Sequence, residues 1–280
     1  MTAPRPFGVL LLVLAALLVV NSALGPLGTG WVDYPISGTL HHQLVGLEVV
    51  TVGLVVPWSV LAGVRALRGD PDTVLLAFAP AAYTLYMFIQ YLLGPEYDSY
   101  QAVVLLHLAV VTLSGGLTLW SWGLSRDAVL PVRSRRSERL YAAALLGLAL
   151  FVVLRYAAAI AGSFTGTGIP EEFAAARTFY WSIYLLDLGV VVPCTVVGAV
   201  ALLRGRDLGR RALFAVTGWF ALVPPSVAAM AVTMLLNDDP NASAATVVLL
   251  TVASVVFAGL AVAVYRAPRS AAASSAAPAG

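Results

Sequence analysis

The sequence predicts an all-α integral membrane protein with eight transmembrane helices, and three observations support that fold class. Of its 280 residues, 60% are hydrophobic and 11% are charged, which is more apolar surface than one soluble core of ordinary composition can bury. Eight stretches are apolar over the roughly 20 residues that a helix needs to cross a hydrocarbon core of about 30 Å. The short connections between them carry arginine and acidic residues in alternation.

The eight stretches are delimited by hydropathy alone. They cover residues 7–24, 43–66, 74–93, 101–124, 139–162, 178–203, 211–236 and 244–265. The first resembles a signal peptide, because Arg5 precedes it and Asn21-Ser22-Ala23 would suit cleavage. We expect it to remain as a membrane helix, because the internal repeat described below includes it. The tail, residues 267–280, is rich in Ala, Ser and Pro and is predicted to be disordered in the cytoplasm.

The charges of the connections predict the orientation. All 16 basic residues are arginines, and 14 of them lie at the termini and in alternate connections. These are Arg5, Arg65, Arg68, Arg126, Arg133, Arg135, Arg136, Arg139, Arg204, Arg206, Arg210, Arg211, Arg266 and Arg269. The other connections hold acids, namely Asp33, Glu96, Asp98, Glu171, Glu172, Asp238 and Asp239. By the positive-inside rule, both termini are cytoplasmic, and we expect the protein in the plasma membrane.

An internal duplication is predicted from a shift of 136 residues. The shift places residues 53–69 over 189–205, with nine of 17 positions identical, including the paired prolines and a terminal Leu-Arg-Gly. We therefore divide the chain into a first four-helix repeat (1–137) and a second (138–266). Because each half has an even number of spans, both enter the membrane from the same side, which is a parallel 4+4 repeat.

The residues of this repeat carry a resemblance. Leu186-Asp187-Leu188-Gly189, followed by Pro193 and Arg204-Gly205, together with Leu47-Glu48 leading to Pro57, resembles a family of uncharacterised multi-pass membrane proteins from actinobacteria and archaea. The resemblance covers most of the chain. It implies a membrane fold of about eight helices and no particular activity.

Ionisable residues inside the spans are the candidate functional groups, because each costs about 2.5 to 3.5 kcal/mol on insertion scales and such groups usually face a bundle interior. They are Glu48, His107, Arg155 and Asp187. Two polar stripes at helical spacing accompany them: Tyr83, Tyr86 and Gln90, and Tyr180, Tyr184 and Asp187. Together these residues predict a polar pocket open to the outside, lined from both halves.

Four prolines inside the spans are candidate helix breaks. Pro57 corresponds to Pro193, and Pro80 to Pro224 under a shift of 144 residues. Proline removes a helix hydrogen bond and frees a carbonyl, and interrupted helices in matching halves indicate a binding site. Proline can also serve only to bend a membrane helix around its neighbours.

Several functional classes lack support in the sequence. The net charge of +2 does not indicate nucleic acid binding. Cys194 is the single cysteine and is expected to pack as a small side chain, and the three histidines show no metal-ligand spacing. No phosphate-binding or dinucleotide motif is present, and Ser114-Gly115-Gly116 has no histidine in a later span to activate a hydroxyl. We therefore expect no metal and no cofactor.

Three functions remain open on these residues. The leading hypothesis is a carrier or channel-like protein for a small solute, ion or proton. The second is a membrane enzyme acting on a lipid or quinone, which is less favoured because no catalytic spacing is recognised. The third is a non-catalytic subunit, sensor or assembly factor, in which Arg155 pairs with Asp187 or Glu48 only to hold the halves together. The lipid bilayer is the one partner that composition requires, and the oligomeric state stays open.

Overall fold

Eight helical runs of the computed structural model are long and apolar enough to cross a membrane, as predicted. The structure describes residues 3–131, 133–174 and 176–266, and within these ranges the regular structure is entirely helical. The expected disordered tail, 267–280, lies outside the described residues. The eight spans are α1 (Arg5–Leu24), α2-η1-α3 (Gly38–Val50, Thr51–Val55, Val56–Leu67), α4 (Thr73–Leu93), α5 (Ala102–Leu124), α6 (Arg135–Arg155), α8-η4-α9 (Arg177–Tyr184, Leu185–Val191, Val192–Leu203), α10-α11 (Asp207–Phe220, Val223–Leu236) and α12 (Ala244–Tyr265). Three short helices connect spans: η2 (Ser125–Asp127), α7 (Ala157–Thr165) and η3 (Glu171–Phe173).

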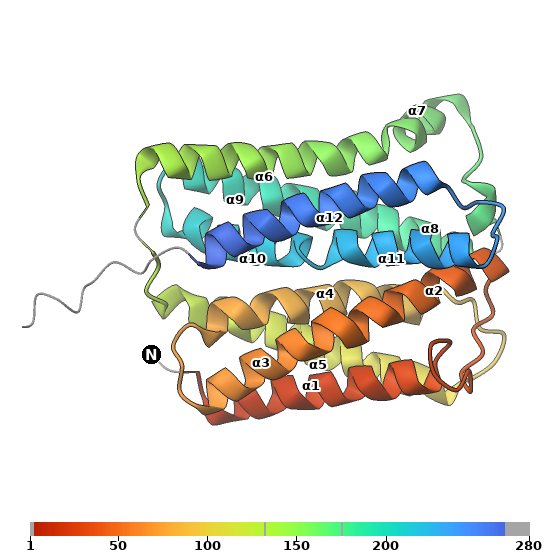
Figure 1. The fold of residues 1–280 in the computed structure, drawn as a ribbon, viewed down its shortest axis with the longest axis horizontal. Coiled ribbons are helices and arrows are strands. Elements are labelled where there is room, and N and C mark those ends of the chain that lie inside the picture. The colour runs from red at the N-terminus through yellow and green to blue at the C-terminus, as the bar shows by residue number, and fades with distance from the viewer. Residues whose placement is uncertain (1–2, 132, 175, 267–280) are drawn as a thin grey trace, which may run out of the picture.

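The helices form two layers, with α1–α5 in one and α6–α12 in the other (Figure 1). In the first layer α1 packs on α3 and α5, and α4 packs on α3 and α5. In the second, α9 packs on α6 and α10, and α12 packs on α10 and α11. Each layer is therefore a four-span bundle, and in both layers consecutive spans contact each other.

The two layers meet along α2, α4, α8, α10 and α11. Here α2 packs on α11, and α4 packs on α8 and α10. Glycine allows the closest approach: a Cβ on Gly46 would overlap the backbone carbonyl of Ala229, and one on Gly94 would overlap the ring of Phe179. Small residues permit helix backbones to approach in this way in membrane proteins. The interface between the layers is therefore tightly packed at these points.

Two spans contain a π-helical turn immediately before a proline. In η1 the N–H of Val56 bonds to the carbonyl of Thr51, and in η4 the N–H of Val192 bonds to that of Asp187. Pro57 and Pro193 follow directly, as second residues of α3 and α9. A proline ring clashes with the carbonyl four residues earlier, so a wider turn at this point lets the helix continue. π-Turns of this kind are frequent at functional sites.

The fifth span ends earlier than predicted. Hydropathy gave residues 139–162, whereas α6 ends at Arg155 and Tyr156 leaves the helical conformation, with φ −97° and ψ 7°. The chain resumes as α7. No Gly or Pro marks this break; Tyr156 instead makes a side-chain bond to the neighbouring span, described below.

The outer faces of the helices are apolar. Leu105, Leu119, Val248 and Val255 are between 64% and 75% exposed, and water would not favour so many exposed aliphatic side chains on one surface. Lipid is the solvent that matches them, so the structure supports a multi-pass membrane protein.

The helix connections lie at two ends of the bundle. The α3–α4, α5–α6 and α9–α10 connections, the start of α1 and the end of α12 lie at one end, at the left of Figure 1, and we call this the basic end. The other four connections lie at the opposite end, which we call the acidic end. The alternation of charge along the sequence thus becomes a separation in space.

A buried carboxylate that the sequence analysis did not single out lies near the basic end. Glu138, at the start of α6, has an almost fully buried side chain. It accepts hydrogen bonds from Arg210 Nε at 2.7 Å and from Arg135 Nη1 at 3.1 Å. The ion pair with Arg210 joins α6 to α10 within the second layer.

Candidate functional site

Asp187 is a buried and hydrogen-bonded acid within the sixth span. It lies in η4, and its side chain is 5% exposed. Oδ1 accepts a hydrogen bond from the Tyr86 hydroxyl at 2.6 Å, and Oδ2 accepts one from the Tyr156 hydroxyl at 2.7 Å. Such short O–H···O contacts are typical of bonds to an ionised acceptor. Because Tyr86 belongs to α4, this carboxylate links the two layers.

Arg155 is the charged partner of Asp187. Its Nη1 lies 3.9 Å from Asp187 Oδ2, and its guanidinium lies 5.6 Å from the centre of the Tyr156 ring. The Arg155 side chain is 48% exposed, whereas that of Asp187 is buried. The pair therefore has its acid enclosed by protein and its cation at an open surface.

Arg155 is also one of the residues that line a cavity of about 280 Å³ between the two layers, which we call the Arg155 cavity. Predicted site residues Tyr86, Gln90 and Arg155 line it. Most of its other lining side chains are apolar, and the polar ones gather at the acidic end. The lining is completed by Gln43, Met87, Phe173, Phe179, Ile183, Val223, Val227, Met230, Ala231, Met234, Asn241, Ala242, Ser243, Thr246 and Leu250.

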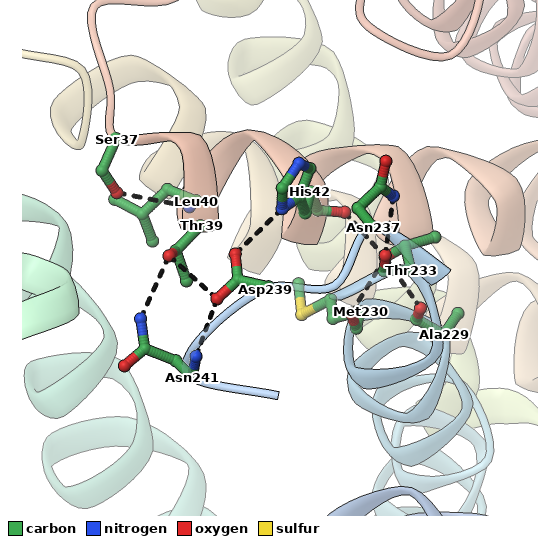
Figure 2. A network of polar contacts seen from close by, with 10 residues as sticks. All are labelled: Ser37, Thr39, Leu40, His42, Ala229, Met230, Thr233, Asn237, Asp239 and Asn241. Atoms are coloured by element: carbon green, nitrogen blue, oxygen red, sulfur yellow. Dashed lines mark hydrogen bonds and ion pairs between the residues drawn. The ribbon is translucent and has the colours of Figure 1, made fainter. Parts of the chain in front are cut away.

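A polar network holds one wall of the cavity at the acidic end. Figure 2 shows Asp239, from the α11–α12 connection, beside Thr39 and His42 of α2. Its carboxylate pairs with His42 Nδ1 at 2.9 Å and accepts hydrogen bonds from Thr39 Oγ1 at 3.2 Å and from the N–H of Asn241 at 2.9 Å. We call Asp239, Thr39, His42 and Asn241, together with Thr233, the Asp239 network. Thr233 belongs to it because its Oγ1 donates a hydrogen bond to the backbone carbonyl of His42 at 2.7 Å. The network fixes Asn241, which lines the cavity.

The electrostatics of Asp239 follow from these contacts. Burial by itself raises its pKa, but hydrogen bonds from Asn241, His42 and Thr39 favour the charged form. The net effect lowers the pKa of Asp239 below its ordinary value of 3.8. Asp239 is therefore a carboxylate over the usual pH range, and it joins α2 to the opposite layer.

Glu48 lies in a different environment, within the first layer. Its side chain is 1% exposed, and Oε2 accepts a hydrogen bond from the backbone N–H of Leu27 at 2.9 Å. A Cβ on Gly25 would overlap Oε1, so the connection between α1 and α2 passes directly over the carboxylate. Glu48 does not line the Arg155 cavity.

His107 is also within the first layer. Its Nε2 lies 3.1 Å from Asn21 Oδ1 and 3.3 Å from the Tyr34 hydroxyl, and its ring stacks on that of Tyr34. Burial raises the pKa of Tyr34, and the nearby Glu48 carboxylate raises it further. His107 and Glu48 are thus neighbours of one loop tyrosine, separate from the pocket in which the sequence analysis grouped them with Arg155.

The remaining predicted tyrosines have structural neighbours. The hydroxyl of Tyr83 lies 2.6 Å from Ser226 Oγ and so bridges α4 and α11. Tyr184 packs edge-on against the ring of Tyr156, with centroids 5.4 Å apart. Tyr180 packs against Phe173, with centroids also 5.4 Å apart. None of the three tyrosines lines the cavity, although Tyr184 supports the ring that binds Asp187.

The four candidate helix breaks differ in their outcome. Pro57 and Pro193 follow the π-turns described above. Before Pro224 a two-residue turn, Ala221 and Leu222, separates α10 from α11, whereas α4 runs through Pro80 without interruption. The break before Pro224 places Val223 at the start of α11, where it lines the cavity.

Three parts of the site were not identified from the sequence. Tyr156 directly follows Arg155, and an aromatic hydroxyl beside an in-span arginine was the available signal. Ser226 lies two residues after Pro224 but gives no signal of its partner. His42 and Asp239 are 197 residues apart, and only the packing of the layers brings them together.

Metal binding and relatives complete the description of the site. Within the described ranges, no three His, Cys, Asp or Glu side chains are grouped so that they could hold a metal ion. No protein-family model, curated protein or solved structure matches this chain.

Proposed function

We propose that this protein is a carrier that binds a small solute in the Arg155 cavity, between two four-helix halves. The observation that carries the proposal is the cavity itself, which is largely apolar, has a few polar groups and lies where the two layers meet. Ligand sites commonly have this composition and this position between structural units. At about 280 Å³, the cavity has the volume of roughly nine water molecules, so the solute is small.

The arginine distribution supports an orientation for this carrier. The basic end carries most of the arginines, so the positive-inside rule places it in the cytoplasm together with both chain termini. The acidic end then faces outward from the plasma membrane. Because Asn241 and Ser243 belong to the acidic end and line the cavity, the cavity opens toward the outside.

An internal repeat supports the location of the site. The shift of 136 residues equates Thr51 with Asp187, and both carbonyls begin a π-turn. The contacts between layers are also reciprocal: α2, in the second span, packs on α11 in the seventh, while α4, in the third, packs on α8 in the sixth. In a parallel 4+4 repeat, the second span corresponds to the sixth and the third to the seventh. The two contacts are therefore the same contact with the two halves exchanged. Carriers built from repeats bind their substrates at the interface of the repeats.

Cysteine accessibility tests the proposal directly. Cys194 is the single cysteine, so Cys194→Ser gives a background for Ala231→Cys in the cavity. Ala143→Cys, on the exposed outer face of α6, is the matched control. A membrane-impermeant thiol reagent should label Ala231→Cys in right-side-out vesicles and, because a carrier alternates between two openings, also in inverted vesicles. Ala143→Cys should be labelled in neither, because lipid covers it.

One observation favours a second candidate, a receptor that binds the solute without moving it. Among the described residues, none that lines the cavity belongs to a connection at the basic end. A receptor predicts labelling of Ala231→Cys in right-side-out vesicles alone. Labelling in inverted vesicles alone would contradict the orientation, and no labelling in either preparation would contradict an accessible solute cavity.

A further inference from the structure

Two consecutive arginines of α10, at the basic end, differ in their partners. Arg210 pairs with Glu138 through Nε at 2.7 Å and with Asp207 through Nη1 at 2.9 Å. Arg211 has no carboxylate partner among the described residues, and its Nε is buried without a hydrogen-bond partner there. A buried donor without a partner costs free energy, and the cost is larger when the group is charged. The protein therefore leaves the charge of Arg211 without a counter-ion.

Arg211 lines a crevice where the two layers meet at the basic end. The start of α4, the end of α5 with η2, and the first turns of α10 form its walls. Two serines, Ser121 and Ser125, lie in the lining with Arg211, and the other lining side chains are apolar or aromatic. The crevice measures about 10 Å³, which is about the room that one water-sized group needs. One oxygen atom of an anion can therefore enter it, while the rest of the anion stays outside.

The hydrogen bonds of the lining leave Arg211 as its available donor. Ser121 Oγ donates to the carbonyl of Val74, and Ser125 Oγ donates to that of Trp122 at 2.7 Å. The guanidinium carbon of Arg211 lies 5.8 Å from the centre of the Trp122 ring, so cation–π attraction holds the group in place without neutralising it. None of the described lining residues is acidic. The crevice thus offers a positive charge and an N–H donor to an anion.

The depth of the crevice indicates which anion can reach it. Because α10 begins at Asp207, Arg211 lies about 6 Å along the helix from its end, at the level where a span meets lipid headgroups. Arg126 and Asp127, which directly follow Ser125, are both exposed. Basic pockets between membrane helices on the cytoplasmic side bind anionic headgroups. The orientation proposed above places this crevice in the cytoplasmic leaflet, which carries the anionic lipids.

We propose that the crevice binds the headgroup of an anionic phospholipid, with one phosphate oxygen on Nε of Arg211. The phosphate supplies the counter-ion that the protein does not, and the acyl chains remain in the bilayer. Arginine suits this role because its planar fork of N–H groups matches the oxygens of a phosphate. The site concerns lipid rather than solute, so it does not depend on the Arg155 cavity.

Lipid titration of the full chain in mild detergent, followed by native mass spectrometry, tests the site. Phosphatidylglycerol and phosphatidylcholine with identical acyl chains are the two probes. Arg211→Gln should weaken the first bound phosphatidylglycerol about tenfold, the loss expected for one hydrogen bond to a charged group. Arg206→Gln is the matched control, because Arg206 is exposed, precedes α10 at the same end and carries the same charge. Equal affinity of Arg211→Gln and the wild type for phosphatidylglycerol would overturn the proposal.

Thermal unfolding in nanodiscs separates lipid binding from a purely structural role. The wild type should melt about 2 °C or more higher in phosphatidylglycerol than in phosphatidylcholine, beyond the change shown by Arg211→Gln. In phosphatidylcholine, Arg211→Gln should melt at or above the wild type, because it removes an unpaired buried donor. An equal destabilisation of Arg211→Gln in both lipids would overturn the proposal. If Arg211→Gln does not fold, Arg211→Lys decides alone: it keeps the charge but loses the planar fork, so an unchanged affinity for phosphatidylglycerol would overturn the proposal.

Inorganic phosphate identifies the source of the anion. It is added to the wild type in phosphatidylcholine nanodiscs, and it should leave the melting temperature unchanged. A rise that matches the effect of phosphatidylglycerol and disappears in Arg211→Gln would mean that the site takes a soluble anion, and the lipid would be wrong. If neither phosphatidylglycerol nor phosphate has an effect that depends on Arg211, a single water molecule satisfies Nε and the proposal is overturned.

Discussion

Asp187 and Glu48 are both buried acids within membrane-spanning helices, yet their partners give them different roles. Asp187 accepts two hydroxyl hydrogen bonds and lies 3.9 Å from an arginine. Glu48 accepts a backbone N–H and lies beneath a loop of its own layer. A buried acid in a membrane helix is therefore only a starting point for assigning function, because its neighbours decide whether it can meet a solute.

The hydroxyl of Tyr156 should contribute measurably to stability. Tyr156→Phe removes the bond to Asp187 Oδ2 and leaves a buried acceptor with one partner fewer. We expect the free energy of unfolding to fall by about 1.5 to 3 kcal/mol, the range for hydrogen bonds to charged groups. Unfolding in mild detergent measures it. Tyr184→Phe is the control, because Tyr184 contacts the same site through its ring, and an equal loss in both variants would contradict the assigned role.

Gly25 should be intolerant of a side chain because of Glu48. A Cβ at this position would overlap Glu48 Oε1, although the backbone conformation, φ −81° and ψ −169°, suits any residue. We expect Gly25→Ala to destabilise the protein by about 1 to 3 kcal/mol, the usual cost of overpacking. Gly38→Ala is the control, because a Cβ there meets open space. Equal melting temperatures for the two variants would show that the loop moves away freely.

At the scale of helices, the sequence predicts where the spans lie, because lipid requires apolar residues there. It does not predict local helix geometry that depends on packing against other spans. Each span needs about 20 apolar residues, so hydropathy locates all eight. The break at Tyr156 lies inside such a run and carries no Gly or Pro, so hydropathy gives no signal of it, and the Tyr156 hydroxyl there binds Asp187 of another span. At the π-turns, the sequence analysis identified only Pro57 and Pro193, as candidate helix breaks, and not the wider turns themselves. Their widened geometry depends on how the helix accommodates the ring.

The candidate site was predictable to the same extent. In-span charge identified Arg155 and Asp187, and these two residues do meet. Glu48 and His107 were grouped with them by depth in the membrane, but depth does not reveal which face of a helix meets which neighbour. The Asp239 network joins α2 to the α11–α12 connection, which lies far from it in the sequence, and no local pattern encodes such a contact.

The contact between α2 and α11 should depend on the absence of a side chain at Gly46. A Cβ there would overlap the backbone of Ala229, which cannot rotate away as a side chain could. We expect Gly46→Ala to lower the free energy of unfolding by about 1 to 3 kcal/mol. Gly116→Ala is the matched control on α5, because nothing lies within 4 Å of its Cβ position. An unchanged Gly46→Ala variant would show that the layers do not approach so closely.

At the scale of the whole molecule, two four-span layers share an interface with polar links at several depths. Tyr83 with Ser226 and Tyr86 with Asp187 link α4 to the second layer. The Asp239 network links α2 to it at the acidic end. A carrier must loosen such links at one end while it keeps them at the other. The network beside the cavity opening is the link most accessible to water, and therefore to pH.

The Asp239 network should lose its stabilising effect in acid. The pKa of Asp239 is lowered below its ordinary value of 3.8 by hydrogen bonds in the folded state. A carboxylate with a depressed pKa stabilises the folded state above the unfolded pKa, and this stabilisation disappears as pH falls through the folded pKa. Asp239→Asn should therefore melt below the wild type at pH 6, and the gap should close as the pH falls below about 3.8.

Asp238→Asn is the matched control for this pH dependence, because Asp238 is the exposed neighbouring acid. It adopts a left-handed conformation, with φ 50°, which asparagine tolerates well. Melting temperatures of the three proteins from pH 6 to pH 3 decide the question. A gap between wild type and Asp239→Asn that does not narrow at all as the pH falls below 3.8 would mean that the carboxylate charge does not hold α2 to the second layer. A gap that closes only for Asp239→Asn would make this network the acid-sensitive contact between the halves.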